Sequence, residues 1–218
     1  MSEEYHRLLF VFVDGVGLAP ASPTNPLATA SMPAVRGLLG GPLTLERVTA
    51  GPRLLLKPID ARLGVDGLPQ SASGQTTLFT GVNGAEAMGR HMTALPGPTL
   101  RAVIEESSVF AELAGRGLSV TFANAYSRQY LDRLAAGGAR PSATTLAVTA
   151  AGIELRMLEH LERGEAVAWD IERDLFGLRG EVELERIDAE RAGRDLVAIA
   201  GRHDLTLYET FLTDVAGH

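Results

Sequence analysis

The sequence predicts an α/β fold, in which a mostly parallel sheet is covered by helices. The first observation is the continuous apolar run from Leu8 to Val13, which is rich in β-formers and typical of a strand buried on both faces. The second is the pair of stretches 118–123 and 204–211, which are predicted as further strands. Helices predicted over 99–115 and 191–202 precede these two strands and would cover the sheet.

Composition limits the functions that are open to the chain. It has 218 residues, 45% hydrophobic and 22% charged, with a mean hydropathy of +0.08, which is typical of a globular protein of one or two domains. The net charge of −7 argues against a nucleic-acid or membrane partner. Without cysteine, any metal site must use Asp, Glu, His and hydroxyl groups. The polar start of the chain is no signal peptide, and no apolar run reaches membrane-spanning length, so we expect a cytoplasmic protein.

Taken from the start of the chain, the predicted first strand ends abruptly at Asp14, which is followed by Gly15 and Gly17. An acidic residue directly after a buried strand lies at the carboxyl edge of the sheet, where open α/β sheets bind ligands. An aspartate before glycine is equally common in a plain turn. The glycine spacing does not match a dinucleotide-binding fingerprint. Residues 18–53 are predicted as a long irregular connection with one helix over 32–39, and 54–59 as a short strand.

The next stretch, Gly67 to Gly81, reads Gly-Leu-Pro-Gln-Ser-Ala-Ser-Gly-Gln-Thr-Thr-Leu-Phe-Thr-Gly. Its start predicts a turn, and the rest predicts a helix that begins near Ser71 and ends at Gly81. Ser71 would then lie at a helix N-terminus, where free N–H groups and the helix dipole favour an anion such as phosphate. A hydroxyl group there becomes a nucleophile when a metal or base stands beside it. The alternative is an ordinary helix N-cap.

From residue 93 to 190 we predict an inserted small α/β domain that lies over the site as a cap. Besides the helix and strand at its start, it would contain a helix over 145–164 and a short strand over 166–169, followed by a charged loop over 170–190. Its arginines, Arg128, Arg133 and Arg140, are suited to clamping phosphate, although each is also compatible with plain surface charge. His91 stands in a loop just before this segment and is either solvated or functional.

The end of the chain contains a possible pair of metal ligands. After the strand predicted over 204–211 come Asp214 and His218, four residues apart across a glycine. One tight turn can direct both side chains at a single cation, and an Asp oxygen with a His nitrogen suits Zn or Mn. By itself this spacing is common by chance.

Together, the three stretches resemble the alkaline phosphatase superfamily. A strand followed by Asp14, then Ser71 before a helix, then a strand followed by Asp214-x-x-Gly-His218, in this order, is most similar to the branch of cofactor-independent phosphoglycerate mutase, phosphopentomutase and their small metalloenzyme relatives. The resemblance extends over essentially the whole chain. It implies a metal-binding core from residues 1–92 and 191–218, with 93–190 as the cap.

The resemblance also implies the chemistry of the site. Ser71 would be the nucleophile that takes up a phosphoryl group between two divalent metal ions, Mn or Zn. Asp14 and Ser71 would ligate one ion, and Asp214 and His218 the other. The substrate would be a small phosphorylated metabolite, which the cap recognises. The side chains that would touch it are His91, Arg128 and Arg140.

Two departures from the family pattern qualify this reading. The mutases have a His four positions after the nucleophile, where this chain has Gln75, which argues against phosphoglycerate itself. The family completes its site with a later Ser-Asp-His-Gly motif and one further His, and neither follows His218 here. We therefore expect the chain to be a fragment of a longer protein, with an incomplete sheet.

Three functions remain open. The first is phosphoryl transfer, by a mutase or a phosphatase. The second is a phosphodiesterase or sulfatase-like hydrolase on the same scaffold, although the Ser71 stretch lacks the Cys/Ser-x-Pro-x-Arg pattern of sulfatases. The third is a non-catalytic remnant that binds a ligand or partner. The sequence leaves the oligomeric state open.

Overall fold

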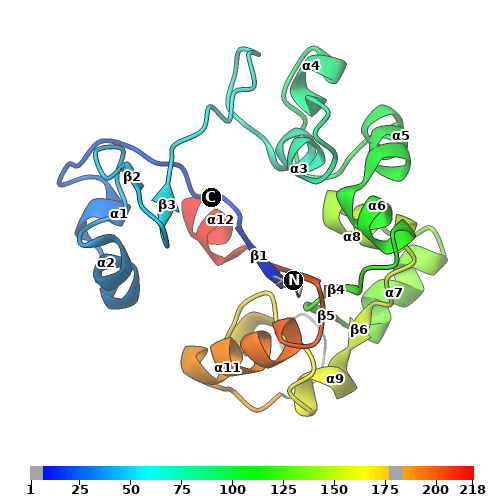
Figure 1. Ribbon diagram of the computed structural model, residues 1–218. Coiled ribbons are helices and arrows are strands. Elements are labelled where there is room, and N and C mark those ends of the chain that lie inside the picture. The colour runs from blue at the N-terminus through cyan, green and yellow to red at the C-terminus, as the bar shows by residue number, and fades with distance from the viewer. Residues whose placement is uncertain (1–6, 177–183) are drawn as a thin grey trace, which may run out of the picture. The chain divides into compact units, whose positions relative to one another are not determined.

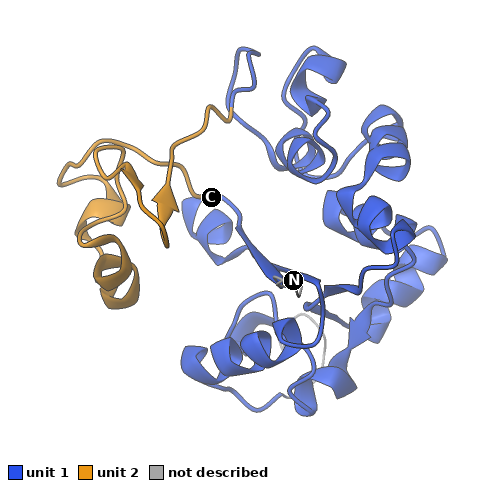
Figure 2. Ribbon diagram, viewed as in Figure 1, with its two compact units in different colours: residues 1–15, 62–218 blue, residues 16–61 orange. Residues whose placement is uncertain are grey.

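The computed structural model describes residues 7–176 and 184–218, and the chain divides into two compact units. One unit is formed by Met1–Gly15 together with Arg62–His218, and the other by Val16–Ala61 (Figure 2). The candidate site residues all belong to the first unit.

The first unit is an α/β fold with a three-stranded parallel sheet. Its strands are β1 (Leu8–Val13), β4 (Val120–Phe122) and β7 (Leu205–Thr210), in the order β1-β7-β4. Along the register Leu8 pairs with Leu205, and Val120 pairs with Leu205 from the other side. β7 is therefore central, and all six of its residues are buried. The predicted parallel sheet is confirmed for these three strands.

Helices α3 (Ser71–Thr80), α5 (Pro98–Ser107), α6 (Val109–Gly115) and α8 (Ala143–Ala150) pack on one face of the sheet, and α11 (Ala189–Ala200) packs on the other (Figure 1). On the first face Phe79 of α3 is fully buried, with its ring 6.2 Å from that of Phe10, 6.4 Å from that of Phe12 and 5.4 Å from that of Phe110. This aromatic cluster fixes α3 against β1. Because alternate residues of a strand share a face, Asp14 follows Phe10 and Phe12 on the α3 side.

The prediction that β1 is buried on both faces is wrong. Its Phe10 and Phe12 face α3, whereas Val11 and Val13 on the other face are 44% and 41% exposed. Leu9 on that face packs against the cluster formed with α11. Among the described elements, β1 also has a neighbouring strand on only one side.

The remaining elements are shorter. In the second unit they are α1 (Pro26–Thr29), α2 (Pro33–Leu39) and the antiparallel pair β2 (Thr49–Ala50) and β3 (Leu55–Leu56). In the first unit they are α4 (Gly84–Met88), α7 (Arg128–Ala135), α9 (Leu158–Glu162), α12 (Leu212–Gly217) and the parallel pair β5 (Ala125–Tyr126) and β6 (Arg156–Met157). No helix in the described ranges is long and apolar enough to cross a membrane.

Several predicted boundaries needed correction. The helix predicted over 99–115 is interrupted at Ser108, whose backbone is extended. The helix predicted over 145–164 ends after Ala150, because Gly152 turns the chain with a φ of +69° and β6 and α9 follow. The strand predicted over 166–169 is reduced to a single bridge between Asn124 and Val167. Part of the loop predicted over 170–190 lies outside the described residues.

The division at residues 92 and 190 stays a prediction. One observation bears on it: β4 belongs to the segment 93–190, yet it pairs with β7 in the main sheet. At least the start of this segment is therefore continuous with the core.

Candidate functional site

The candidate site lies at the carboxyl edge of the parallel sheet. All three strands run in the same direction, so the residues that follow them meet at one edge. Asp14 directly follows β1, Phe211 directly follows β7, and Asn124 follows β4 after one intervening residue. This is the edge at which open α/β sheets place their ligands.

Asp14 and Ser71 are brought together at this edge. Ser71 Oγ donates a hydrogen bond to the Asp14 carboxylate, 3.1 Å from Oδ2, although the residues are 57 positions apart. Ser71 is the first helical residue of α3, after the N-cap residue Gln70, so the ordinary N-cap alternative does not describe it. Gly81 ends α3 in the left-handed conformation, with a φ of +73°. The predicted helix is therefore confirmed at both ends.

The first turn of α3 is held by the loop that contains His91. The amide of Met92 donates to Ser73 Oγ over 3.1 Å, and the amide of Ala72 donates to the carbonyl of Met92 over 3.2 Å. His91 itself donates from Nε2 to the carbonyl of Val65, 3.1 Å away. Its visible role is to join two loops beside α3, and its predicted contact with substrate stays a prediction.

The start of α12 packs directly against the loop after β1. Thr213 donates from its hydroxyl to the carbonyl of Asp14. Gly15 has a φ of +74°, and a Cβ placed there would lie 2.6 Å from Cα of Asp214. Only glycine permits this approach, which sets Asp214 beside Asp14.

The electrostatics show that the carboxylates share one region. Burial raises the pKa of Asp14, the hydrogen bond from Ser71 opposes this, and the negative charge of Asp214 raises that pKa further. Asp214 is half-buried, and its Oδ1 lies 3.5 Å from Nε2 of the exposed His218. The structure therefore brings Asp14, Ser71 and Asp214 into one region, with His218 at its exposed side.

These residues have the chemical groups that the expected metal ions prefer, but they are too few to complete two metal sites. Carboxylate, hydroxyl and imidazole groups suit Mn or Zn. However, within residues 7–176 and 184–218 no group of three or more Asp, Glu or His side chains could hold a metal ion. Each of two ions would have two ligands here, whereas a catalytic zinc site generally has three and a water. Metal binding stays a prediction.

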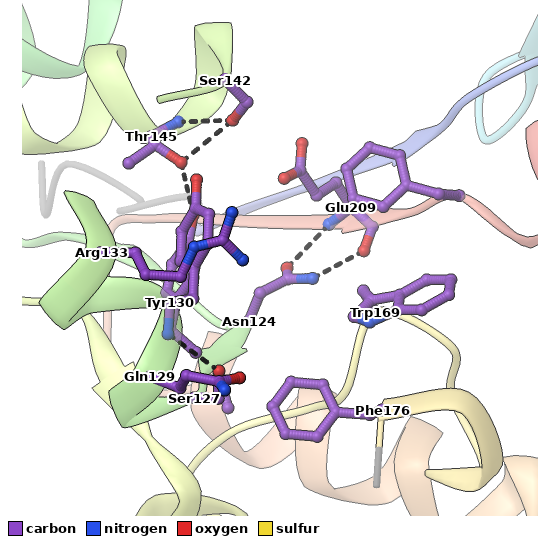
Figure 3. Close-up of a pocket in the computed structure, with 13 residues that line it drawn as sticks. Asn124, Ser127, Gln129, Tyr130, Arg133, Ser142, Thr145, Trp169, Phe176 and Glu209 are labelled. Atoms are coloured by element: carbon purple, nitrogen blue, oxygen red, sulfur yellow. Dashed lines mark hydrogen bonds between the residues drawn. The ribbon is translucent and has the colours of Figure 1, made fainter. Parts of the chain in front are cut away.

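A pocket of about 410 Å³ opens at the same edge of the sheet (Figure 3). Its lining residues come from the ends of β4 and β7, from β5, α7 and α8, and from the segment after residue 168. They are Asn124, Ala125, Tyr126, Ser127, Gln129, Tyr130, Arg133, Ser142, Thr145, Trp169, Phe176, Glu209 and Phe211. Arg133 lines the pocket, whereas Arg128 and Arg140, the two arginines chosen from the sequence, are exposed and do not.

Glu209 is the functional candidate that the sequence analysis missed. It lies on the central strand, is 3% exposed, and accepts a hydrogen bond at Oε2 from Thr144 over 2.5 Å. Burial raises its pKa to about 8; the Thr144 hydrogen bond opposes this rise, and the charge of Asp14 adds to it. The side chain of Asn124 bonds both the amide and the carbonyl of Glu209, at 2.9 and 2.7 Å. The sequence did contain one signal for Glu209, because a glutamate within a predicted strand of β-formers is unusual.

Comparison of the chain with protein-family models, with curated proteins and with solved structures finds no match.

Proposed function

We propose that this protein catalyses metal-dependent phosphoryl transfer on a small phosphorylated metabolite, with Ser71 as the nucleophile. The observation that carries the proposal is the hydrogen bond from Ser71 Oγ to the Asp14 carboxylate at the carboxyl edge of a parallel sheet. Two residues far apart in sequence meet where ligands bind in such folds, and one is a potential nucleophile at a helix N-terminus. The order of Asp14, Ser71, Asp214 and His218 along the chain adds the resemblance to the alkaline phosphatase superfamily.

In this proposal the residues have distinct roles. Two divalent ions, when bound, would lower the pKa of the serine hydroxyl and stabilise the oxygens of the transferring phosphoryl group. Asp14 accepts the Ser71 hydrogen bond and, in the proposal, would hold Oγ in position to attack phosphorus. The N-terminal turn of α3 favours the negative charge of the phosphate. The phosphoryl group then passes to a second substrate hydroxyl in a mutase, or to water in a phosphatase.

The finer parts of the proposal also rest on the resemblance. The core would be of the alkaline phosphatase type, with residues 93–190 as the cap that selects the substrate. Because the described residues give each ion two ligands, the proposal requires further ligands from outside them. The ions would be Mn or Zn.

The test is turnover of p-nitrophenyl phosphate by the full-length protein supplied with Mn²⁺ or Zn²⁺. Ser71→Ala should lower kcat by several orders of magnitude while leaving the fold intact, because a lost nucleophile is not replaced. Mass spectrometry should detect a phosphoryl adduct on Ser71 in the unmodified protein and none in the variant.

Ser73→Ala is the matched control, two residues away on the same turn. Ser73 is buried, accepts from the amide of Met92 and donates to the carbonyl of Gln70. Its loss should cost about 1 kcal/mol of stability and leave the chemistry largely intact. Near-normal turnover in Ser71→Ala would refute the proposal. If the unmodified protein hydrolyses only phosphodiesters, phosphodiesterase activity becomes the better assignment.

A further inference from the structure

The pocket at the sheet edge has neither Ser71 nor Asp14 in its lining, and it differs in character from the region around these two residues. Five of its thirteen lining residues are aromatic, and Arg133 is the one cationic side chain among the thirteen. A site built for phosphate presents several donors or cations, whereas this lining is mainly flat and apolar. Its volume of about 410 Å³ lies within the range of roughly 300–1,000 Å³ that small-molecule sites occupy.

The aromatic side chains form two facing walls. Tyr126 and Tyr130 are stacked, with ring centroids 5.4 Å apart and an interplanar angle of 9°. Trp169 and Phe211 form a second pair, 6.1 Å apart. Figure 3 shows Tyr130 on one side and Trp169 with Phe176 on the other, with Asn124 and Glu209 between them. Space between two aromatic walls suits a flat ring that stacks on either of them.

The polar groups of the pocket are few and well placed for the edge of such a ring. Glu209 is almost completely buried and lines the pocket, and its Oε2 accepts a hydrogen bond from Thr144. The amide of Gln129 on α7 can donate and accept at the pocket rim. Since the pKa of Glu209 is raised to about 8, its carboxyl group carries a proton near neutral pH and can donate a hydrogen bond.

We propose, resting on the phosphoryl-transfer function above, that this pocket binds the organic part of the substrate and that this part carries a planar heteroaromatic ring, as in a nucleoside phosphate. The ring stacks between the Tyr130 wall and the Trp169 wall, and its polar edge meets Glu209 and Gln129. The placement is consistent, because Phe211 of the pocket lies three residues before Asp214 and the charge of Asp14 acts on Glu209. The phosphate would then extend toward Ser71.

The chain offers a direct reporter of this pocket. Trp169 is its only tryptophan, so tryptophan fluorescence reports occupancy of one wall without any label. The probes are adenosine, adenosine 5′-monophosphate, ribose 5-phosphate and inorganic phosphate, each titrated into metal-free protein. Adenosine and its monophosphate should change the fluorescence saturably. Ribose 5-phosphate and phosphate should not.

Variants on α7 test the stacking wall. Tyr130→Ala should weaken adenosine binding roughly tenfold, as expected for the loss of one stacking partner. Tyr130→Phe keeps the ring and should bind as the unmodified protein does. Asp132→Ala is the control, because Asp132 is exposed on the same helix and does not line the pocket. The circular dichroism spectrum of each variant should match that of the unmodified protein, as a check that its helix content is retained.

The outcomes separate this inference from the proposed function. Adenosine carries no phosphate and the assay requires no turnover, so binding that persists in Ser71→Ala supports the pocket assignment even if the phosphoryl-transfer proposal fails. The inference is overturned if adenosine leaves the fluorescence unchanged. It is also overturned if ribose 5-phosphate or phosphate alone gives the same change, or if Tyr130→Ala binds adenosine as tightly as Tyr130→Phe.

Discussion

Titration of Glu209 should make the protein less stable as the pH rises from about 4.5 to about 8. The pKa of this carboxyl group is raised from 4.5 to about 8 in the folded protein, first by burial and then by the charge of Asp14, against the opposing hydrogen bond from Thr144. The unfolded chain releases the proton near pH 4.5, whereas the folded protein keeps it until about pH 8. Between these values the folded state binds more protons, so the free energy of unfolding falls with rising pH.

The magnitude follows from the size of the shift. At about 1.36 kcal/mol per pKa unit, the displacement from 4.5 to about 8 corresponds to about 5 kcal/mol over the whole window. This contribution is fully present below pH 4.5 and is lost as the pH rises through 8. It is comparable to the total stability of a marginal domain, which is about 5–15 kcal/mol.

The substitution Glu209→Gln tests this pH dependence. Glutamine has nearly the same shape and can accept the Thr144 hydrogen bond, but it does not ionise. Urea denaturation of metal-free protein at a series of pH values gives the free energy of unfolding of each form. The unmodified protein should lose several kcal/mol more than Glu209→Gln between about pH 4.5 and about pH 8. Glu106→Gln, an exposed position on α5, should follow the unmodified protein. Equal pH slopes for Glu209→Gln and the unmodified protein would show that folding does not raise the pKa of Glu209.

Two further predictions concern the residues around the site. Gly15→Ala should lower the free energy of unfolding by about 2–4 kcal/mol, measured by urea or thermal denaturation. The added Cβ would lie 2.6 Å from Cα of Asp214, and the backbone at Gly15 has a φ of +74°. A stability equal to that of the unmodified protein would show that α12 can move away from Asp14. Arg133→Ala should raise KM for a phosphorylated substrate roughly tenfold or more, as for a lost charge-assisted hydrogen bond, with Arg128→Ala and Arg140→Ala changing it less. The reverse ranking would support the arginines chosen from the sequence.

The sequence was sufficient for features that depend on local chemistry. Gly81 and the hydroxyl-rich start at Ser71 predicted α3, because helix ends have their own residue preferences. The end of the apolar run predicted the position of Asp14 at the sheet edge. The same run did not predict that Val11 and Val13 are exposed, since burial depends on which elements pack against a strand.

The pocket could not be predicted in the same way. Its lining comes from segments between residues 124 and 211, and nothing in their local sequence shows that they converge. Glu209 is the clearest case: in the sequence it is one glutamate among β-formers, and only its burial on the central strand raises its pKa. The sequence analysis favoured Arg128 and Arg140 over Arg133 as substrate contacts. Which side of a helix faces a pocket depends on where the pocket lies, and the sequence does not show this.

The carboxylates at the sheet edge form a linked set. The charge of Asp214 raises the pKa of Asp14, and the charge of Asp14 raises that of Glu209, so each proton held by one group makes it easier to ionise the next. The like charges raise the pKa of Asp14 and Glu209, whereas the hydrogen bonds from Ser71 and Thr144 and the charge of His218 oppose part of this rise. Carboxyl groups with pKa values perturbed in this way are common at functional sites, and structural networks also produce them. Positive charge brought to Asp14 would lower its pKa and that of Glu209, so that cation binding, folding stability and the proton on Glu209 would be coupled through one edge of the sheet.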